Sequence, residues 1–333
     1  LILPSFRREL FPKIGWIIHN EFMSALVIRF LTGVAILLIA SHLLVRIAEK
    51  ISLAFKISPL IVAITLVAIG TSIPELAVST TALYKHDSGL AMGNIVGSNI
   101  VNILLVFAVG ILIGKLRVGS TKTQRTSTIV LITTIGFILF QILPINHITS
   151  GLILISGSIL ITVIEGFYAA NGKNKEDFKM FKYKRRPHLG ILSILTLIAL
   201  IPLVILGSQL AVSAIEGISQ LTGYSTAILG LSLTAIATSL PELLTTIVSQ
   251  EEHQEKITVG NILGSNIYNL LLIGGIINLS SVKNGISPKD WVTLFLVTVF
   301  FVFILRRYSG KNIPRRYGFI LLGGLILYLA TLS

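Results

Sequence analysis

The sequence predicts an all-α membrane protein with ten transmembrane helices, arranged as two inverted five-helix repeats. Two observations lead to this prediction: long apolar runs joined by short polar connections, and one internal duplication. Of the 333 residues, 53% are hydrophobic and 12% are charged, whereas about 25% are charged in a soluble domain. Because so few charges cannot cover a water-facing surface, the composition excludes a soluble enzyme, a disordered chain and a nucleic-acid-binding domain.

Each predicted span approaches the roughly 20 apolar residues that cross a bilayer. The ten spans are 30–47, 58–83, 90–114, 126–143, 148–170, 189–214, 225–249, 257–280, 290–305 and 316–332. The corresponding regions are an N-terminal segment (1–23), a first repeat (24–170), a basic linker (171–188) and a second repeat (189–333). No connection is long enough for a soluble domain, and residues 1–23 lack the features of a signal peptide.

The duplication appears when the sequence is shifted by 167 residues. Residues 58–105 then align with 225–272 without a gap, and 21 of the 48 pairs are identical. The identical pairs include Pro, Glu, Asn, Ser and Gly in register, which shared apolar composition does not explain. We call two residues related by this shift twins. Because five spans are an odd number, the second copy must enter the membrane from the opposite side, as in many secondary transporters.

The basic residues predict the orientation of the chain. The connections after the odd-numbered spans hold 20 Lys and Arg residues, and the other side holds 7. Because cytoplasmic loops are enriched in Lys and Arg, the stretch from Lys173 to Arg186 is predicted to be cytoplasmic and both termini external. The short loops favour a bacterial or archaeal plasma membrane as the location.

Two glutamates lie inside predicted spans, Glu75 and its twin Glu242. A charge at the bilayer centre costs about 2.5–3.5 kcal/mol on insertion scales, so it needs a functional reason. Pro74 and Pro241 precede the glutamates and are predicted to break each helix there, since proline provides no N–H and clashes with the carbonyl four residues back. Residues three and four positions before each glutamate share its helix face. These are Thr71 and Ser72 in the first copy and Thr238 and Ser239 in the second.

The following span of each copy adds amide and hydroxyl groups in a stripe with a period of four. The stripes are Asn94, Ser98 and Asn102 in the first copy, and Asn261, Ser265 and Asn269 in the second. The glycines of the same spans, Gly93 and Gly97 with their twins Gly260 and Gly264, follow a pattern that lets helix backbones approach closely.

These residues offer only oxygen ligands and two carboxylates. Such sites suit hard cations, and Ca²⁺ in particular takes 6–8 oxygens. The chain has no cysteine, and no histidine belongs to the set, so zinc, copper and iron sites are disfavoured. Two negative charges neutralise one Ca²⁺ and are slightly exceeded by three Na⁺, which permits alternating occupancy by the two ions. No motif indicates a cofactor, an enzymatic nucleophile or a phosphate-binding loop.

Two segments of each copy resemble the α1 and α2 repeats of the sodium/calcium exchanger family, a branch of the cation/calcium antiporters. These segments are residues 70–75 and 93–99 in the first copy, and those that begin at Ala237 and Gly260 in the second. The α1 motif corresponds to 66–105 and the α2 motif to 233–272. The resemblance implies four central cation sites and a movement of spans 1 and 6 across the other eight helices. The long regulatory loop of the animal exchangers is absent between the repeats.

The resemblance also implies a role for each residue of the set. Glu75 and Glu242 would bind Ca²⁺, and Thr71 and Thr238 would add side-chain and backbone oxygens. The sodium sites would use Ser72, Ser98, Ser239, Ser265 and the carbonyls of Ala68 and Ala235, with Asn102 and Asn269 at the centre. Potassium-dependent members carry aspartate where this chain has Asn269, so the resemblance argues against potassium coupling.

The sequence therefore predicts a non-enzymatic secondary antiporter that exchanges Ca²⁺ for Na⁺ by alternating access. A Ca²⁺/H⁺ antiporter is an alternative, because two glutamates could carry protons, and a cation channel is a weaker one. The expected partners are the two transported ions and the lipid bilayer. No cofactor, nucleic acid or obligatory protein partner is expected.

Overall fold

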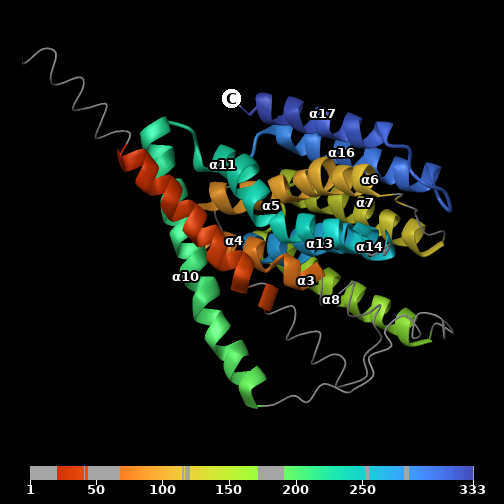
Figure 1. Cartoon of the computed structure of the whole chain (residues 1–333), viewed down its shortest axis with the longest axis horizontal. Helices are drawn as coiled ribbons and strands as arrows, with labels where there is room; N and C mark the ends of the chain where they lie inside the picture. Colours follow the sequence, from red (N-terminus) through yellow and green to blue (C-terminus); the bar gives the residue numbers. More distant parts are fainter. Residues whose placement is uncertain are drawn as a thin grey trace, which may run out of the picture.

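A computed structural model describes residues 21–40, 42–43, 68–114, 116, 121–171, 191–251, 255–280 and 285–332. Every regular element within these ranges is a helix. Figure 1 shows that the helix over residues 21–40 crosses α10 on one flank, while the other helices form a bundle beside this pair.

Eight of the helical stretches in the described ranges are long and apolar enough to cross a membrane. The helix Arg316–Ala330 is also apolar but shorter. The first repeat contains Glu21–Ala40, α3 (Ala68–Thr71), α4 (Ile73–Tyr84), α5 (Ser88–Val101), η2 (Asn102–Phe107), α6 (Ala108–Ile113), α7 (Thr121–Ile142) and α8 (His147–Asn171). The second contains α10 (Ile191–Thr222), α11 (Thr226–Leu229), η3 (Gly230–Thr234), α12 (Ala235–Thr238), α13 (Leu240–Glu251), α14 (Glu255–Tyr268), η4 (Asn269–Ile273), α15 (Gly274–Leu279), α16 (Pro288–Arg307) and α17 (Arg316–Ala330).

The two helices on the flank differ most from the predicted spans. The first helix already includes Glu21, nine residues before the predicted start of the span at residue 30, and it carries Arg29 with an exposed side chain. Helix α10 continues eight residues beyond the predicted end to Thr222. It accommodates Glu216 because this carboxylate forms an ion pair with Lys85 at 2.7 Å.

Some predictions fall outside the described residues. They concern most of the N-terminal segment (1–20), the first part of the second span (58–67), the linker from 172 to 188 and the C-terminal Ser333. The linker prediction is corrected at one edge, because α8 includes Asn171.

The predicted helix breaks are confirmed in both copies. Helix α3 ends at Thr71 and α4 begins at Ile73, with Ser72 between them at φ −86° and ψ 9°. The twin Ser239 separates α12 from α13 at φ −81° and ψ 5°. The proline at the second position of each following helix explains the break, since its missing N–H costs nothing at a helix start.

Two π-helical turns, which the sequence analysis did not predict, begin at twin residues. The turn η2 starts at Asn102 and η4 starts at Asn269. A third π-helical turn, η3, precedes α12. Turns of this kind insert one additional residue into a helix and frequently occur at functional sites.

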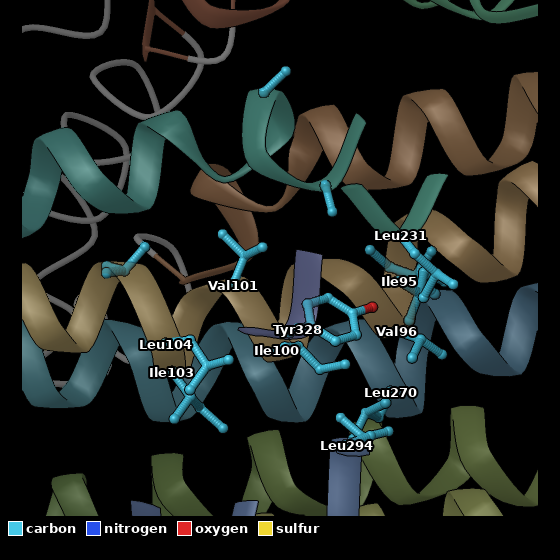
Figure 2. Close-up of a cluster of buried hydrophobic side chains, with 14 of the residues drawn as sticks. Ile95, Val96, Ile100, Val101, Ile103, Leu104, Leu231, Leu270, Leu294 and Tyr328 are labelled. Atoms are coloured by element: carbon cyan, nitrogen blue, oxygen red, sulfur yellow. The ribbon is translucent and has the colours of Figure 1, made fainter. Parts of the chain in front are cut away.

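Helix α5 is the centre of the apolar core. Figure 2 shows Ile95, Val96 and Ile100 among buried side chains from α14–η4, α16 and α17. The backbone approach predicted at Gly93 and Gly97 is confirmed, because a Cβ at Gly97 would lie 2.7 Å from the Leu231 carbonyl oxygen. At the twin Gly260, a Cβ would have no neighbour within 4 Å among the residues that the structure describes.

The pair of helices on the flank is joined by a glycine crossing. A Cβ on Gly33 would lie 2.7 Å from the carbonyl oxygen of Gly207, and a Cβ on Gly207 would lie 2.9 Å from that of Gly33. The two backbones therefore touch without intervening side chains.

Candidate cation-binding site

The two carboxylates lie at matching places inside the bundle. Glu75 is in the first turn of α4 and Glu242 in the first turn of α13, and both are 0% exposed. The breaks at Ser72 and Ser239 place a helix N-terminus next to each glutamate, where the partial positive charge of the helix favours an anion. Local structure thus partly compensates the cost of burying the two carboxylates.

Hydrogen bonds connect each carboxylate to the opposite copy. Ser72 Oγ donates to Glu242 Oε1 at 3.2 Å, and Ser239 Oγ donates to Glu75 Oε1 at 3.4 Å. Ser265 Oγ also donates to Glu242 Oε1, at 3.1 Å. Because the first two bonds are twins, the two copies meet at the carboxylates.

The threonines connect the copies in the same symmetrical way. Thr71 Oγ1 donates to Asn261 Oδ1 at 3.3 Å, and Thr238 Oγ1 donates to Asn94 Oδ1 at 3.1 Å. Thr238 Oγ1 also lies 3.3 Å from Ser98 Oγ, and Thr71 Oγ1 lies 3.4 Å from Ser265 Oγ. The predicted stripes on α5 and α14 therefore lie against the broken helices of the opposite copy.

The remaining predicted residues also lie within this region. The carbonyl of Ala68 accepts a hydrogen bond from the Ser72 N–H at 3.2 Å, and its oxygen lies 3.3 Å from Thr71 Oγ1. The carbonyl of Ala235 accepts the twin bond from Ser239 at 3.1 Å, and its oxygen lies 3.5 Å from Thr238 Oγ1. Both carbonyls are thus engaged by the protein itself in this structure.

Several buried oxygens of the site accept no hydrogen bond. Four of them form two twin pairs: Oε2 of Glu75 and of Glu242, and Oδ1 of Asn102 and of Asn269. Each of these residues is 0% exposed. A buried acceptor without a donor is costly, so oxygens of this kind are suited to a positively charged ligand.

The sequence analysis missed two asparagines of this region. Asn266 Oδ1 accepts a hydrogen bond from Asn102 Nδ2 at 3.2 Å, and Asn99 Oδ1 is a further buried acceptor without a partner. Both follow the serine of their stripe by one residue. Asn99 also lies three residues before Asn102, a spacing that places two residues on one helix face. This spacing is the sequence signal that could have identified Asn99 as part of the site.

The donor set is chemically uniform. Its oxygens come from carboxylates, hydroxyls, amides and backbone carbonyls, and within the described ranges no group of three His, Cys, Asp or Glu side chains is placed to hold a metal. Two carboxylates among many neutral oxygens suit hard cations, whereas soft or transition metals prefer sulfur and imidazole ligands.

Comparisons with known proteins agree with this chemistry. The inner membrane protein YrbG of Escherichia coli is 29% identical over 310 residues, which cover 91% of this chain and 95% of the relative. The sodium/calcium exchanger MaX1 of Methanosarcina acetivorans is 26% identical and covers 91% of this chain, with 97% of its own length matched. Among solved structures, the sodium-calcium exchanger NCX_Mj soaked with 10 mM Na⁺ and zero Ca²⁺ matches with a TM-score of 0.64 and 26% identity, over 93% of this chain and all of that one.

The profile of the family described as sodium/calcium exchanger protein matches residues 25–168 and 192–333. These two ranges include both copies of the duplicated motif and nearly all the described helices. Together with the buried oxygen-rich site, the match shows that this chain belongs to the sodium/calcium exchanger family.

Proposed function

We propose that this protein is a secondary active antiporter that exchanges Ca²⁺ for Na⁺ by alternating access. The observation that carries the proposal is the set of four buried acceptor oxygens without donors on Glu75, Glu242, Asn102 and Asn269. Bound hard cations would supply the positive charge that these acceptors lack. Family membership and the likeness to an exchanger structure support the same assignment.

In this proposal the two glutamates are the charged ligands of Ca²⁺. The hydroxyls that now donate to them, Ser72 and Ser239, can rotate and offer a lone pair to the cation instead. Thr71, Thr238 and the carbonyls of Ala68 and Ala235 then complete the Ca²⁺ and Na⁺ sites. The serines and asparagines of the two stripes contribute the remaining oxygens (Ser98, Ser265, Asn94, Asn261, Asn102 and Asn269).

The proposal includes two inverted five-helix repeats. The twin hydrogen bonds between the copies support it, since they relate the first half to the second at the level of single atoms. A site at the junction of inverted repeats is exposed to one side of the membrane or the other as the repeats move. We assign the protein to a prokaryotic plasma membrane, with both termini external.

The decisive experiment is Ca²⁺ uptake into proteoliposomes loaded with Na⁺ and diluted into Na⁺-free buffer at equal pH. Uptake that follows the Na⁺ gradient is the expected result. Uptake driven only by a pH gradient would instead indicate Ca²⁺/H⁺ exchange. Flux that needs no counter-ion on the opposite side would indicate a channel.

A further inference from the structure

One of the differences between the two copies is a hydrogen bond next to the carboxylates. In the first copy, Asn94 Nδ2 donates to Ser79 Oγ at 3.0 Å and to the Glu75 carbonyl at 3.3 Å. Ser79 Oγ in turn donates to the Ala91 carbonyl at 3.3 Å. The polar groups beside Glu75 therefore satisfy one another and close the packing between α4 and α5.

In the second copy the twin bond is absent. The twin residues are Asn261 and Thr246, which are 1% and 0% exposed. Among the residues that the structure describes, Asn261 Nδ2 and Thr246 Oγ1 have no hydrogen-bond partner. Since buried polar groups are nearly always satisfied by protein or water, this place beside Glu242 is suited to water or a cation.

The polar character continues along α13 away from Glu242. Thr246 is four residues beyond Glu242 and Gln250 four beyond Thr246, so the three share one helix face. Gln250 Nε2 donates to Thr258 Oγ1 of α14 at 3.0 Å. We call Thr246, Gln250, Thr258 and Asn261 the polar seam.

Gly110 of α6 and Gly114, which follows the end of α6, provide the space for the polar seam. A Cβ on Gly110 would lie 3.1 Å from Thr246 Cγ2 and 3.2 Å from Thr258 Cγ2. A Cβ on Gly114 would lie only 2.1 Å from Gln250 Oε1. Larger residues at these two positions would displace the polar side chains.

Farther from the carboxylate, the corresponding place in the first copy is apolar. The twins of Gln250, Thr258 and Gly110 are Leu83, Ala91 and Ile277. The hydrogen bonds of Asn94 and Ser79 close the first copy, whereas Asn261 and Thr246 leave polar groups available to water or a cation beside Glu242. The asymmetry therefore favours a transport role for the polar seam.

We propose that the polar seam is a hydrated route by which water and the transported cations pass between Glu242 and the membrane face where α13 ends. The route rests on the proposed function, because it serves the same site. The exposed Glu251 marks its outer end. On the predicted topology this end is cytoplasmic, and the apolar twin region faces the outside.

The test uses the absence of cysteine from the chain. Single cysteines replace Thr246 and Gln250, and the matched controls replace their twins, Ser79 and Leu83. The probe is Ag⁺ in nitrate buffer, a thiol-reactive cation close to Na⁺ in size, added to inside-out or right-side-out vesicles. Thiols react as thiolates, and a dry apolar site suppresses the thiolate.

We expect Thr246→Cys and Gln250→Cys to react from the cytoplasmic face at least about tenfold faster than Ser79→Cys and Leu83→Cys react from the external face, a factor that corresponds to one pKa unit of the thiol. Equal rates for all four variants, or reaction of the first two only from the external face, would overturn the proposal. Transport by the unmodified chain is measured separately. A failure of Na⁺-driven Ca²⁺ uptake would refute the antiport assignment. The reaction rates of the cysteine variants with Ag⁺ would still test the route, because they do not depend on that measurement.

Discussion

Replacement of Glu242 by glutamine tests the site most directly. Glu242 is 0% exposed, its Oε1 accepts hydrogen bonds from Ser72 and Ser265 at 3.2 and 3.1 Å, and its Oε2 accepts none. Glutamine keeps the size and an acceptor oxygen but removes the charge. We therefore expect Glu242→Gln to fold and to lose Ca²⁺ binding and Ca²⁺ transport.

The size of the loss follows from the burial of the carboxylate. Removing one partner of a buried, paired charge costs about 3–5 kcal/mol, which corresponds to a roughly 10²- to 10⁴-fold weaker affinity for Ca²⁺. The twin variant Glu75→Gln should show an equally large effect, because Glu75 is as deeply buried and also has a free Oε2.

The assay combines calorimetric titration of the purified protein with Ca²⁺ and uptake of Ca²⁺ into Na⁺-loaded proteoliposomes. The control is Glu251→Gln, which removes an exposed carboxylate at the end of the same helix. It should bind and transport Ca²⁺ like the unmodified chain. Near-normal Ca²⁺ affinity in Glu242→Gln, with an unchanged melting temperature, would refute the role of Glu242 as a Ca²⁺ ligand.

Three further predictions concern topology, packing and coupling. An impermeant thiol reagent on intact cells should label Ser333→Cys but not Lys175→Cys, and the reverse pattern would refute external termini. Gly97→Ala should lower the free energy of unfolding by about 1–3 kcal/mol, because the added methyl group overpacks against a carbonyl. The control Gly136→Ala, whose methyl group would have open space around it, should leave the free energy of unfolding unchanged in the same denaturant titration. If three Na⁺ exchange for one Ca²⁺, each cycle moves one net positive charge, and an inside-negative potential of 100 mV contributes about 2.3 kcal/mol per cycle. Vesicles clamped at this potential should therefore export Ca²⁺ faster than vesicles at zero potential. Voltage-independent flux would exclude this stoichiometry. Potassium should have no specific effect, because position 269 is Asn269 rather than aspartate.

The helix breaks and the meeting of the two copies were predictable because single residues determine them. Pro74 and Pro241 remove a backbone donor wherever they occur, and buried glutamates must find partners. The twin residues of the duplication therefore indicated both the breaks at Ser72 and Ser239 and the residues that gather around them.

Other features were not predictable because hydropathy carries no signal for them. Residues 103–107 are all apolar, so an additional residue in a turn changes no pattern, and the turn η2 was missed. The first span was placed too late because Arg29 looks incompatible with a span, although its side chain lies on an exposed face. The asymmetry between Ser79 and Thr246 appears as a conservative difference in sequence and becomes informative only through the hydrogen bonds.

The π-helical turns at Asn102 and Asn269 also have a consequence for how this sequence can change. One additional residue rotates all that follows by about 100° around the helix axis. If η2 wound as a regular α-helix without losing that residue, α6 would turn to a new face. Gly110 would then leave its place beside Thr246, although no side chain of the carboxylate cluster had been altered. We therefore expect the width of these turns to be as important for function as the residues that we propose as ion ligands.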